Sequence, residues 1–198
     1  DELEKIKKVK GLPEYLDNAR DWLIISCYTG QRVSDFMRFE KSMLRENEGK
    51  TFLDVNQVKT GKTVTIPVLP EVVEVLDKRN GEFPRPISDQ RYNEWIKKVC
   101  EQAKLNDKTQ GRLATNINPD KKGKSIIRNV LGSYEKWELV TSHIGRRSFA
   151  TNYYGKIPTS YLKNITGHGS EAVFLAYIGK SSNDTALEAY ELLLNAKL

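Results

Sequence analysis

The spacing of apolar residues predicts helices along much of the chain. Over 14–28, apolar side chains recur every three or four residues, as on the buried face of a helix, at Leu16, Ala19, Leu23 and Cys27. The Thr29-Gly30 pair that follows is typical of a helix end. A short second helix is predicted over 33–39, and the same spacing predicts helices over 71–79 and 89–105.

Between 40 and 70 the pattern changes to that of strands. The segments FLDV, QVK and TVTIPV predict a small antiparallel sheet. The TGK turn between the last two segments makes a hairpin that carries Lys59 at its turn, and Pro67 and Pro70 end the sheet.

The segment 106–134 is polar, basic and poorly periodic, and no element is predicted there. A short strand or extended run is predicted over 135–140, followed by a helix over 143–154 that Ser142 caps. Pro158 begins another helix that Gly167 ends, and 183–197 forms an amphipathic tail helix. The predicted fold class is therefore mainly α with one small antiparallel β-sheet (α+β).

The charge of the chain favours a polyanionic partner. Its 198 residues include 32 Lys and Arg against 26 Asp and Glu, a net charge of +6. The excess is concentrated in 101–150, with ten basic residues against five acidic ones. Such a patch suits nucleic acid, because each neutralised phosphate releases condensed counterions.

Other classes of protein are disfavoured by what the sequence contains. Cys27 and Cys100 lie in apolar helical patterns without metal-ligand spacing, so we expect reduced core thiols and neither a disulfide nor a zinc site. The longest mostly apolar stretch, 22–28, is far shorter than the roughly 20 residues of a membrane span. We expect a cytoplasmic protein with no membrane partner.

Candidate chemistry gathers in the last third of the chain. Its two histidines lie in SHIGRRSFAT (His143) and ITGHGSEAVFLAY (His168). Taken singly, a histidine near a helix start is more often a cap or packing residue than a catalyst. Arg146 follows His143 by three residues, so on a helix both share a face and could converge on one phosphate. Arg147 points elsewhere, as a DNA backbone contact or a surface charge.

Together with two earlier segments, these motifs resemble the catalytic domain of tyrosine recombinases, the integrases of phages and mobile elements. TGQRVSD resembles the family's first arginine box, VKTGKTVTIPV its lysine hairpin, SHIGRRSFAT its His-x-x-Arg box, and TGHGS its second histidine box. The family's nucleophilic tyrosine follows the last histidine by nine residues, which is Tyr177 here. Two departures are Thr166, where the family has leucine, and Gly145, where it often has a bulkier apolar residue.

The resemblance implies a fold, a reaction and a set of residues. It implies the tyrosine recombinase catalytic-domain fold and a DNA strand cleaved and rejoined through a covalent 3′-phosphotyrosine, without cofactor or metal. The arginines stabilise the phosphate, the lysine protonates the leaving 5′-oxygen, His143 assists as acid or base, and His168 donates a hydrogen bond. The implied catalytic residues are Arg32, Lys59, His143, Arg146, His168 and the nucleophile Tyr177, with Asp35 in support and with Lys62, Lys121, Lys122, Lys124 and Arg147 contacting DNA.

The resemblance also implies an organisation. We expect a catalytic domain over 1–180 with a linker-like start over 1–13, and a tail helix over 181–198 that packs on a neighbouring protomer. The partner is double-stranded DNA, bound by a tetramer on paired sites, and the family's N-terminal DNA-clamping domain is not in this chain.

Several alternatives stay open. Lys62 could replace Lys59 as the acid, and Asp35 could be a solvated helix residue. A type IB topoisomerase that relaxes DNA has similar chemistry, and a non-catalytic DNA-binding module could keep the same fold.

Overall fold

The computed structural model describes residues 2–118 and 125–196. Its elements, in chain order, are α1 (Glu2–Lys7), α2 (Glu14–Thr29), α3 (Val33–Phe36), η1 (Lys41–Met43), β1 (Leu44–Asn47), β2 (Lys50–Asn56), β3 (Thr63–Pro67), α4 (Pro70–Lys78), α5 (Asp89–Gln102), β4 (Lys108–Asn116), β5 (Ile127–Glu135), η2 (Lys136–Leu139), α6 (His143–Tyr153), α7 (Thr159–Thr166), α8 (Glu171–Ile178) and α9 (Ser182–Asn195), where η marks a short 3₁₀ helix. The predicted fold class, mainly α with small antiparallel sheets, is confirmed.

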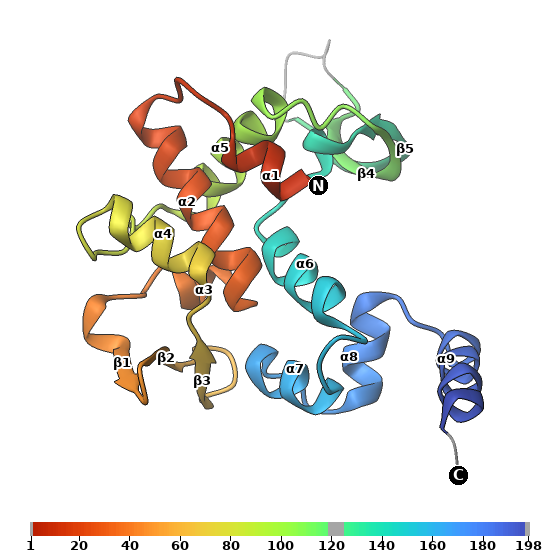
Figure 1. The fold of residues 1–198 in the computed structure, drawn as a ribbon. Helices are drawn as coiled ribbons and strands as arrows, with labels where there is room; N and C mark the ends of the chain where they lie inside the picture. The colour runs from red at the N-terminus through yellow and green to blue at the C-terminus, as the bar shows by residue number, and fades with distance from the viewer. Residues whose placement is uncertain (1, 119–124, 197–198) are drawn as a thin grey trace.

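Helix α2 is the centre of the larger hydrophobic core. It packs against α4, α5 and α6 (Figure 1). Trp22 and Ile25 are completely buried, and Leu16 nearly so. A helix that is apolar on more than one face has to be covered on more than one side. Residues 2–7, expected to be part of a linker-like start, form α1, whose Ile6 is buried in this core.

The sheet differs from its prediction in one strand. Its order is β1-β2-β3, all antiparallel, and Leu53 of β2 faces Ile66 of β3 on the buried side. FLDV and TVTIP form strands, but QVK does not; it enters the hairpin turn, and the third strand is β1 instead. Val58 made this segment look strand-like, yet its side chain is exposed.

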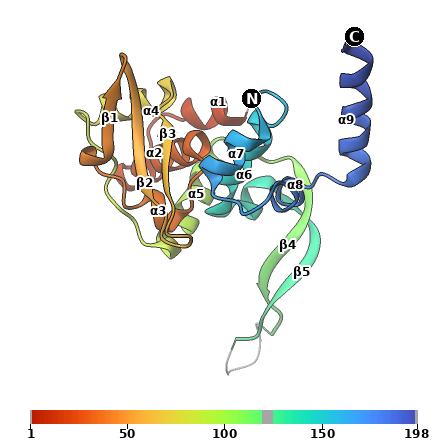
Figure 2. The same cartoon turned by 90° about the horizontal axis from the view of Figure 1, so that it is seen from below.

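The unassigned segment 106–134 contains most of a two-stranded ribbon. Strands β4 and β5 pair from Lys108↔Glu135 to Asn116↔Ile127 and project from the body of the molecule (Figure 2). No residue of either strand is fully buried, and β4 alternates only between exposed and half-buried positions, so the sequence lacks the strong apolar alternation of a strand that faces a core. The extended run expected over 135–140 is also wrong, because η2 turns the chain there.

A second, smaller core lies under α6, α7 and α8, where Phe149, Ala150, Leu162 and Phe174 are buried. The predictions for α2, α4, α5, α6, α7 and α9 are confirmed within a few residues, whereas α3 is shorter than expected and α8 was not assigned. Helix α9 extends away from the body in both views (Figures 1 and 2), although its Glu188 accepts a hydrogen bond from the Tyr154 hydroxyl at 2.6 Å.

Cys27 and Cys100 are buried free thiols, and burial raises the pKa of each to about 12. Within 2–118 and 125–196, the helices are all too short or too polar to cross a membrane.

A glycine sets the distance between α2 and α6. A Cβ atom built on Gly145 would lie 1.9 Å from Ser26 Oγ and 3.0 Å from the Ser26 carbonyl carbon. The two helices therefore touch through their backbones at this point, which accounts for the small residue before Arg146.

We expect Gly145→Ala to push α6 away from α2 and to lower the free energy of unfolding by about 1–3 kcal/mol, the usual cost of overpacking. Chemical denaturation measures this. Gly169→Ala is the matched control, because a Cβ there meets nothing within 4 Å. Equal stability of the two variants would contradict the close contact.

Candidate active site

Arg146 is the most buried basic side chain of the site, with 2% of its surface exposed. It lies on α6, and its guanidinium reaches two carbonyl groups at the ends of other helices. Nη1 donates to the Gly30 carbonyl at 2.9 Å, and Nη2 donates to the Thr166 carbonyl. One side chain thus joins α6 to the C-terminal ends of α2 and α7.

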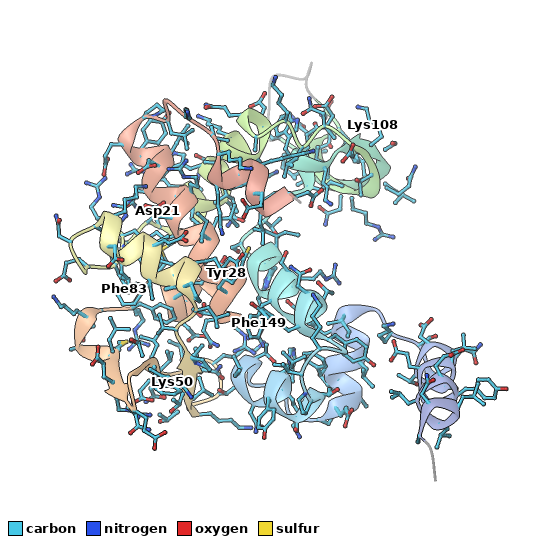
Figure 3. All side chains as sticks on the ribbon, in the orientation of Figure 1. Asp21, Tyr28, Lys50, Phe83, Lys108 and Phe149 are labelled. Carbon is cyan, nitrogen blue, oxygen red and sulfur yellow. The ribbon has the colours of Figure 1, made fainter. Side chains whose placement is uncertain are left out.

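Glycines shape both of these helix ends. Gly30 and Gly167 follow α2 and α7 in the left-handed conformation, with φ of 66° and 67°. A Cβ on Gly30 would lie 2.5 Å from the ring of Phe149, which is labelled in Figure 3. Side chains at these positions would therefore displace the carbonyls that Arg146 binds.

Arg32 and Asp35 lie at the start of α3, directly after the end of α2. Arg32 Nη1 is 3.9 Å from Asp35 Oδ2, and both atoms are buried without a hydrogen-bond partner in residues 2–118 and 125–196. The other carboxylate oxygen, Asp35 Oδ1, accepts a bond from the Val58 amide at 2.8 Å. Asp35 is 1% exposed, so the solvated alternative for this residue is wrong. Arg32 keeps a buried donor available for a ligand.

His168 follows the αL turn after α7 and faces Arg146. The Thr166 hydroxyl donates to the Leu162 carbonyl at 2.5 Å, so it accepts the proton of His168 Nδ1, 2.7 Å away. His168 Nε2 is then the acceptor that lies 3.5 Å from Arg146 Nη2. Burial and the charges of Arg146 and Arg32 lower the pKa of His168 to about 4. The imidazole is therefore neutral at pH 7 in the free chain.

Tyr177 on α8 completes the cluster. Its ring lies 4.9 Å from the His168 ring, and the guanidinium carbons of Arg146 and Arg147 both lie 5.8 Å from its centroid. The hydroxyl oxygen is buried and makes no hydrogen bond to the described residues. A hydroxyl group left free beside a guanidinium group is available for chemistry.

The electrostatics of the cluster favour an anion. Burial and, next, the charge of Arg32 lower the pKa of Arg146 to about 10, an effect that Tyr177 and Asp35 partly offset. Arg146 stays protonated at neutral pH although the positive charge of Arg32 disfavours its own. A bound phosphate removes that repulsion and supplies acceptors for the free donors.

The two hairpin lysines are exposed. Lys59 lies in the turn between β2 and β3, and its ammonium makes no hydrogen bond or ion pair to residues 2–118 or 125–196. Lys62 lines a cavity of about 660 Å³ between β3 and α7, together with Lys163 and His168. Geometry alone therefore leaves both lysines free to approach a ligand.

Other predicted residues lie outside the buried cluster. His143 begins α6 with an exposed side chain that forms no hydrogen bond or ion pair within the described segments. Arg147 is exposed, and its Nη2 donates to the Tyr177 carbonyl at 3.3 Å, so it touches the cluster from outside. Lys121, Lys122 and Lys124 lie outside the described residues.

Sequence reasoning missed the polar groups that hold the site. Thr166 orients His168, and Gln31 and Gln57 are completely buried beside it. The available signal was polar side chains directly next to motif residues, in TGQR and NQVK. In the part of the chain that the structure describes, no three His, Cys, Asp or Glu side chains gather as metal ligands.

We expect His168 to titrate near pH 4 in the free protein, which NMR of its ring protons measures. Arg146→Gln removes one cause of the low pKa and should move it toward the ordinary 6.5. Because the unfolded chain binds this proton more readily, the free energy of unfolding should fall as the pH drops from 6.5 toward 4. Titration of His168 at its ordinary value in the wild-type chain would contradict the geometry.

Comparisons with known proteins find likeness at the level of structure. No model of a protein family matches the sequence, and no curated protein does. Among solved structures, the XerH site-specific recombinase bound to its difH substrate aligns with a TM-score of 0.60 at 14% identity, over 95% of this chain and 50% of that one.

Two other solved structures agree. A lambda integrase dimer bound to a COC' core site aligns with a TM-score of 0.56 at 20% sequence identity, over 92% of this chain and 58% of that one. The XerA recombinase aligns with a TM-score of 0.59 at 16% sequence identity, over 96% of this chain and 62% of that one. The chain thus spans about half to three-fifths of the length of these proteins. It has the fold of tyrosine recombinase catalytic domains.

Proposed function

We propose that this chain cleaves and rejoins DNA strands as the catalytic part of a site-specific recombinase. The observation that carries the proposal is the partly buried cluster of Arg32, Arg146, His168 and Tyr177, in which one nitrogen of Arg32 and the Tyr177 hydroxyl have no hydrogen-bond partner among the described residues. Two guanidinium groups beside a free hydroxyl suit a phosphodiester that is attacked by that hydroxyl.

The proposed reaction begins with the scissile phosphate between the two arginines. The Tyr177 oxygen attacks phosphorus and loses its proton, which His143 or solvent accepts. The P–O5′ bond breaks, and Lys59 gives a proton to the departing oxygen. The 3′-phosphate stays on Tyr177 until a 5′-hydroxyl attacks it, re-forming the diester and releasing the tyrosine. The bond energy is kept throughout, so the exchange needs no nucleotide.

The charge that develops on the non-bridging oxygens is the reason for two arginines. Each planar guanidinium can bind two oxygens at once, and Arg146 is held in place before the ligand arrives. Because the Tyr177 hydroxyl is covered in the free chain, α8 or its flanking turns have to shift when DNA binds. The cavity that Lys62 and Lys163 line beside His168 gives the DNA backbone a cationic edge.

We expect Tyr177→Phe to abolish formation of a covalent protein–DNA adduct without loss of stability, since the lost hydroxyl makes no hydrogen bond within the described part of the chain. The probe is a pool of nicked duplexes with randomised sequence around the nick, followed by denaturing gel analysis and peptide mapping.

Tyr190→Phe, on exposed α9, is the control and should form the adduct normally. An adduct that persists in Tyr177→Phe would refute the nucleophile. A wild-type chain that binds the pool without any adduct would be a DNA-binding module, and sequence-independent relaxation of a supercoiled plasmid would indicate a topoisomerase.

We expect Lys59→Ala to slow cleavage of ordinary DNA by roughly 100-fold or more, the lower range for loss of a general acid. A substrate with sulfur in place of the bridging 5′-oxygen should restore most of the rate, because a thiolate leaves without a proton. Single-turnover rates on both substrates measure this. If Lys62→Ala, and not Lys59→Ala, recovers its cleavage rate on the sulfur substrate, then Lys62 is the general acid.

We also propose that α9 packs on a neighbouring protomer when the protein is bound to paired DNA sites. Its apolar side chains are largely exposed in the single chain, among them Leu187, Tyr190, Leu192, Leu193 and Leu194. One solved lambda integrase structure is a tetramer bound to a Holliday junction.

For this helix, we expect Leu193→Lys to lower the number of protomers on paired-site DNA, as measured by sedimentation, with no change in melting temperature because Leu193 is 73% exposed. Unchanged assembly would rule out this role.

A further inference from the structure

Two buried glutamine side chains connect three segments of the candidate site. Gln31 lies between α2 and α3, and Gln57 lies where β2 enters the hairpin turn; both are completely buried. Gln57 Nε2 donates to Gln31 Oε1 at 2.8 Å and to the Ile165 carbonyl at 3.2 Å. Gln31 Nε2 donates to the same Ile165 carbonyl at 2.8 Å and to the Thr29 carbonyl at 3.0 Å. The ends of α2, β2 and α7 are thus joined.

The residues of the hairpin turn that follow Lys59 also form hydrogen bonds to this network. The Thr60 hydroxyl donates to Gln57 Oε1 at 2.9 Å, and the Gly61 amide donates to the Gln57 carbonyl at 2.8 Å. On the other flank, the Val58 amide donates to Asp35 Oδ1. Lys59 lies between these anchored residues, so its backbone is fixed although its side chain is free.

The turn after α7 is shaped to admit the glutamine. A Cβ atom on Gly167 would lie 2.1 Å from Gln57 Oε1. Gly167 directly precedes His168, so the glutamine touches the segment that presents the histidine. The distance from the lysine turn to the histidine turn is therefore set by this contact.

Stability alone is a weak reason for the arrangement. Desolvating two primary amides offsets much of what their hydrogen bonds gain, and apolar side chains of similar volume fill a core at lower cost. A fully bonded polar network contributes fixed geometry instead. Here the geometry that it fixes is that of the Lys59 turn.

We propose that Gln57, supported by Gln31 and Thr60, is a positioning residue that holds the Lys59 turn against the His168 turn so that the ammonium reaches the leaving oxygen. This inference rests on the proposed function. It predicts that breaking the network impairs protonation of the leaving group and leaves phosphate stabilisation intact.

The test compares single-turnover cleavage of ordinary DNA with cleavage of the 5′-bridging sulfur substrate. Gln57→Met keeps the length of the side chain and removes its hydrogen bonds. Thr60→Val, at an exposed residue, removes the bond to Gln57 and a longer one that the hydroxyl accepts from the Lys62 amide. Both should slow cleavage of ordinary DNA, Gln57→Met by roughly 10- to 100-fold, the scale of a misplacement of about 1 Å. Both should recover most of the wild-type rate on the sulfur substrate.

Thr60→Ser keeps the hydroxyl and should cleave ordinary DNA normally. Thr115→Val, which removes an exposed hydroxyl bond on β4, is the matched control and should show no defect. If the network has a purely structural role, the variants should cleave both substrates more slowly by the same factor, and that result would overturn the proposal. Thr60→Val tests this independently if Gln57→Met is unstable. If the wild-type chain forms no adduct, the proposed function itself fails; if Lys59→Ala shows rescue and both network variants do not, only this inference fails.

Discussion

The site depends on one buried guanidinium. When Arg146 is buried, its guanidinium loses its hydrogen bonds to water. It forms bonds to two carbonyls at helix ends and to His168 in their place. Removing it would leave those carbonyls unpaired and separate α6 from the ends of α2 and α7. The same bonds that compensate its burial also fix it in space. Its position is therefore determined by the fold before any ligand is present.

The second arginine makes the arrangement unfavourable without an anion. Arg32 lowers the pKa of both Arg146 and His168, which shows how closely the positive groups are brought together. Asp35 offsets part of this charge, but one of its oxygens and one nitrogen of Arg32 have no hydrogen-bond partner among the residues that the structure describes. Sites that store unpaired polar groups and repulsion in this way are more often used for binding or catalysis than for stability.

Close backbone contacts make this convergence possible. Gly145 lets α6 touch α2 at Ser26, Gly30 accommodates the Phe149 ring, and Gly167 admits the Gln57 amide. Each contact brings a segment carrying a functional residue within reach of another. The small residue at position 145 is then explained by packing, since it faces α2.

The sequence by itself determined the helices with strong apolar faces and the order of the polar motifs. Leu16, Leu23 and Cys27 predicted α2, because burial imposes a period that can be read without a structure. It did not determine the ribbon of β4 and β5, because neither strand has a fully buried residue that would require a strongly apolar side chain. It also did not determine that the exposed Val58 lies in a turn.

Tertiary structure alone decided how the motif residues meet. The bonds of Arg146 to Gly30 and Thr166 join residues 116 and 20 positions apart, and the Gln31–Gln57 pair spans 26. Nothing in local spacing fixes such distances, because they follow from how whole helices pack. The neutral state of His168 has the same origin: its pKa depends on burial and on charges brought in by other segments.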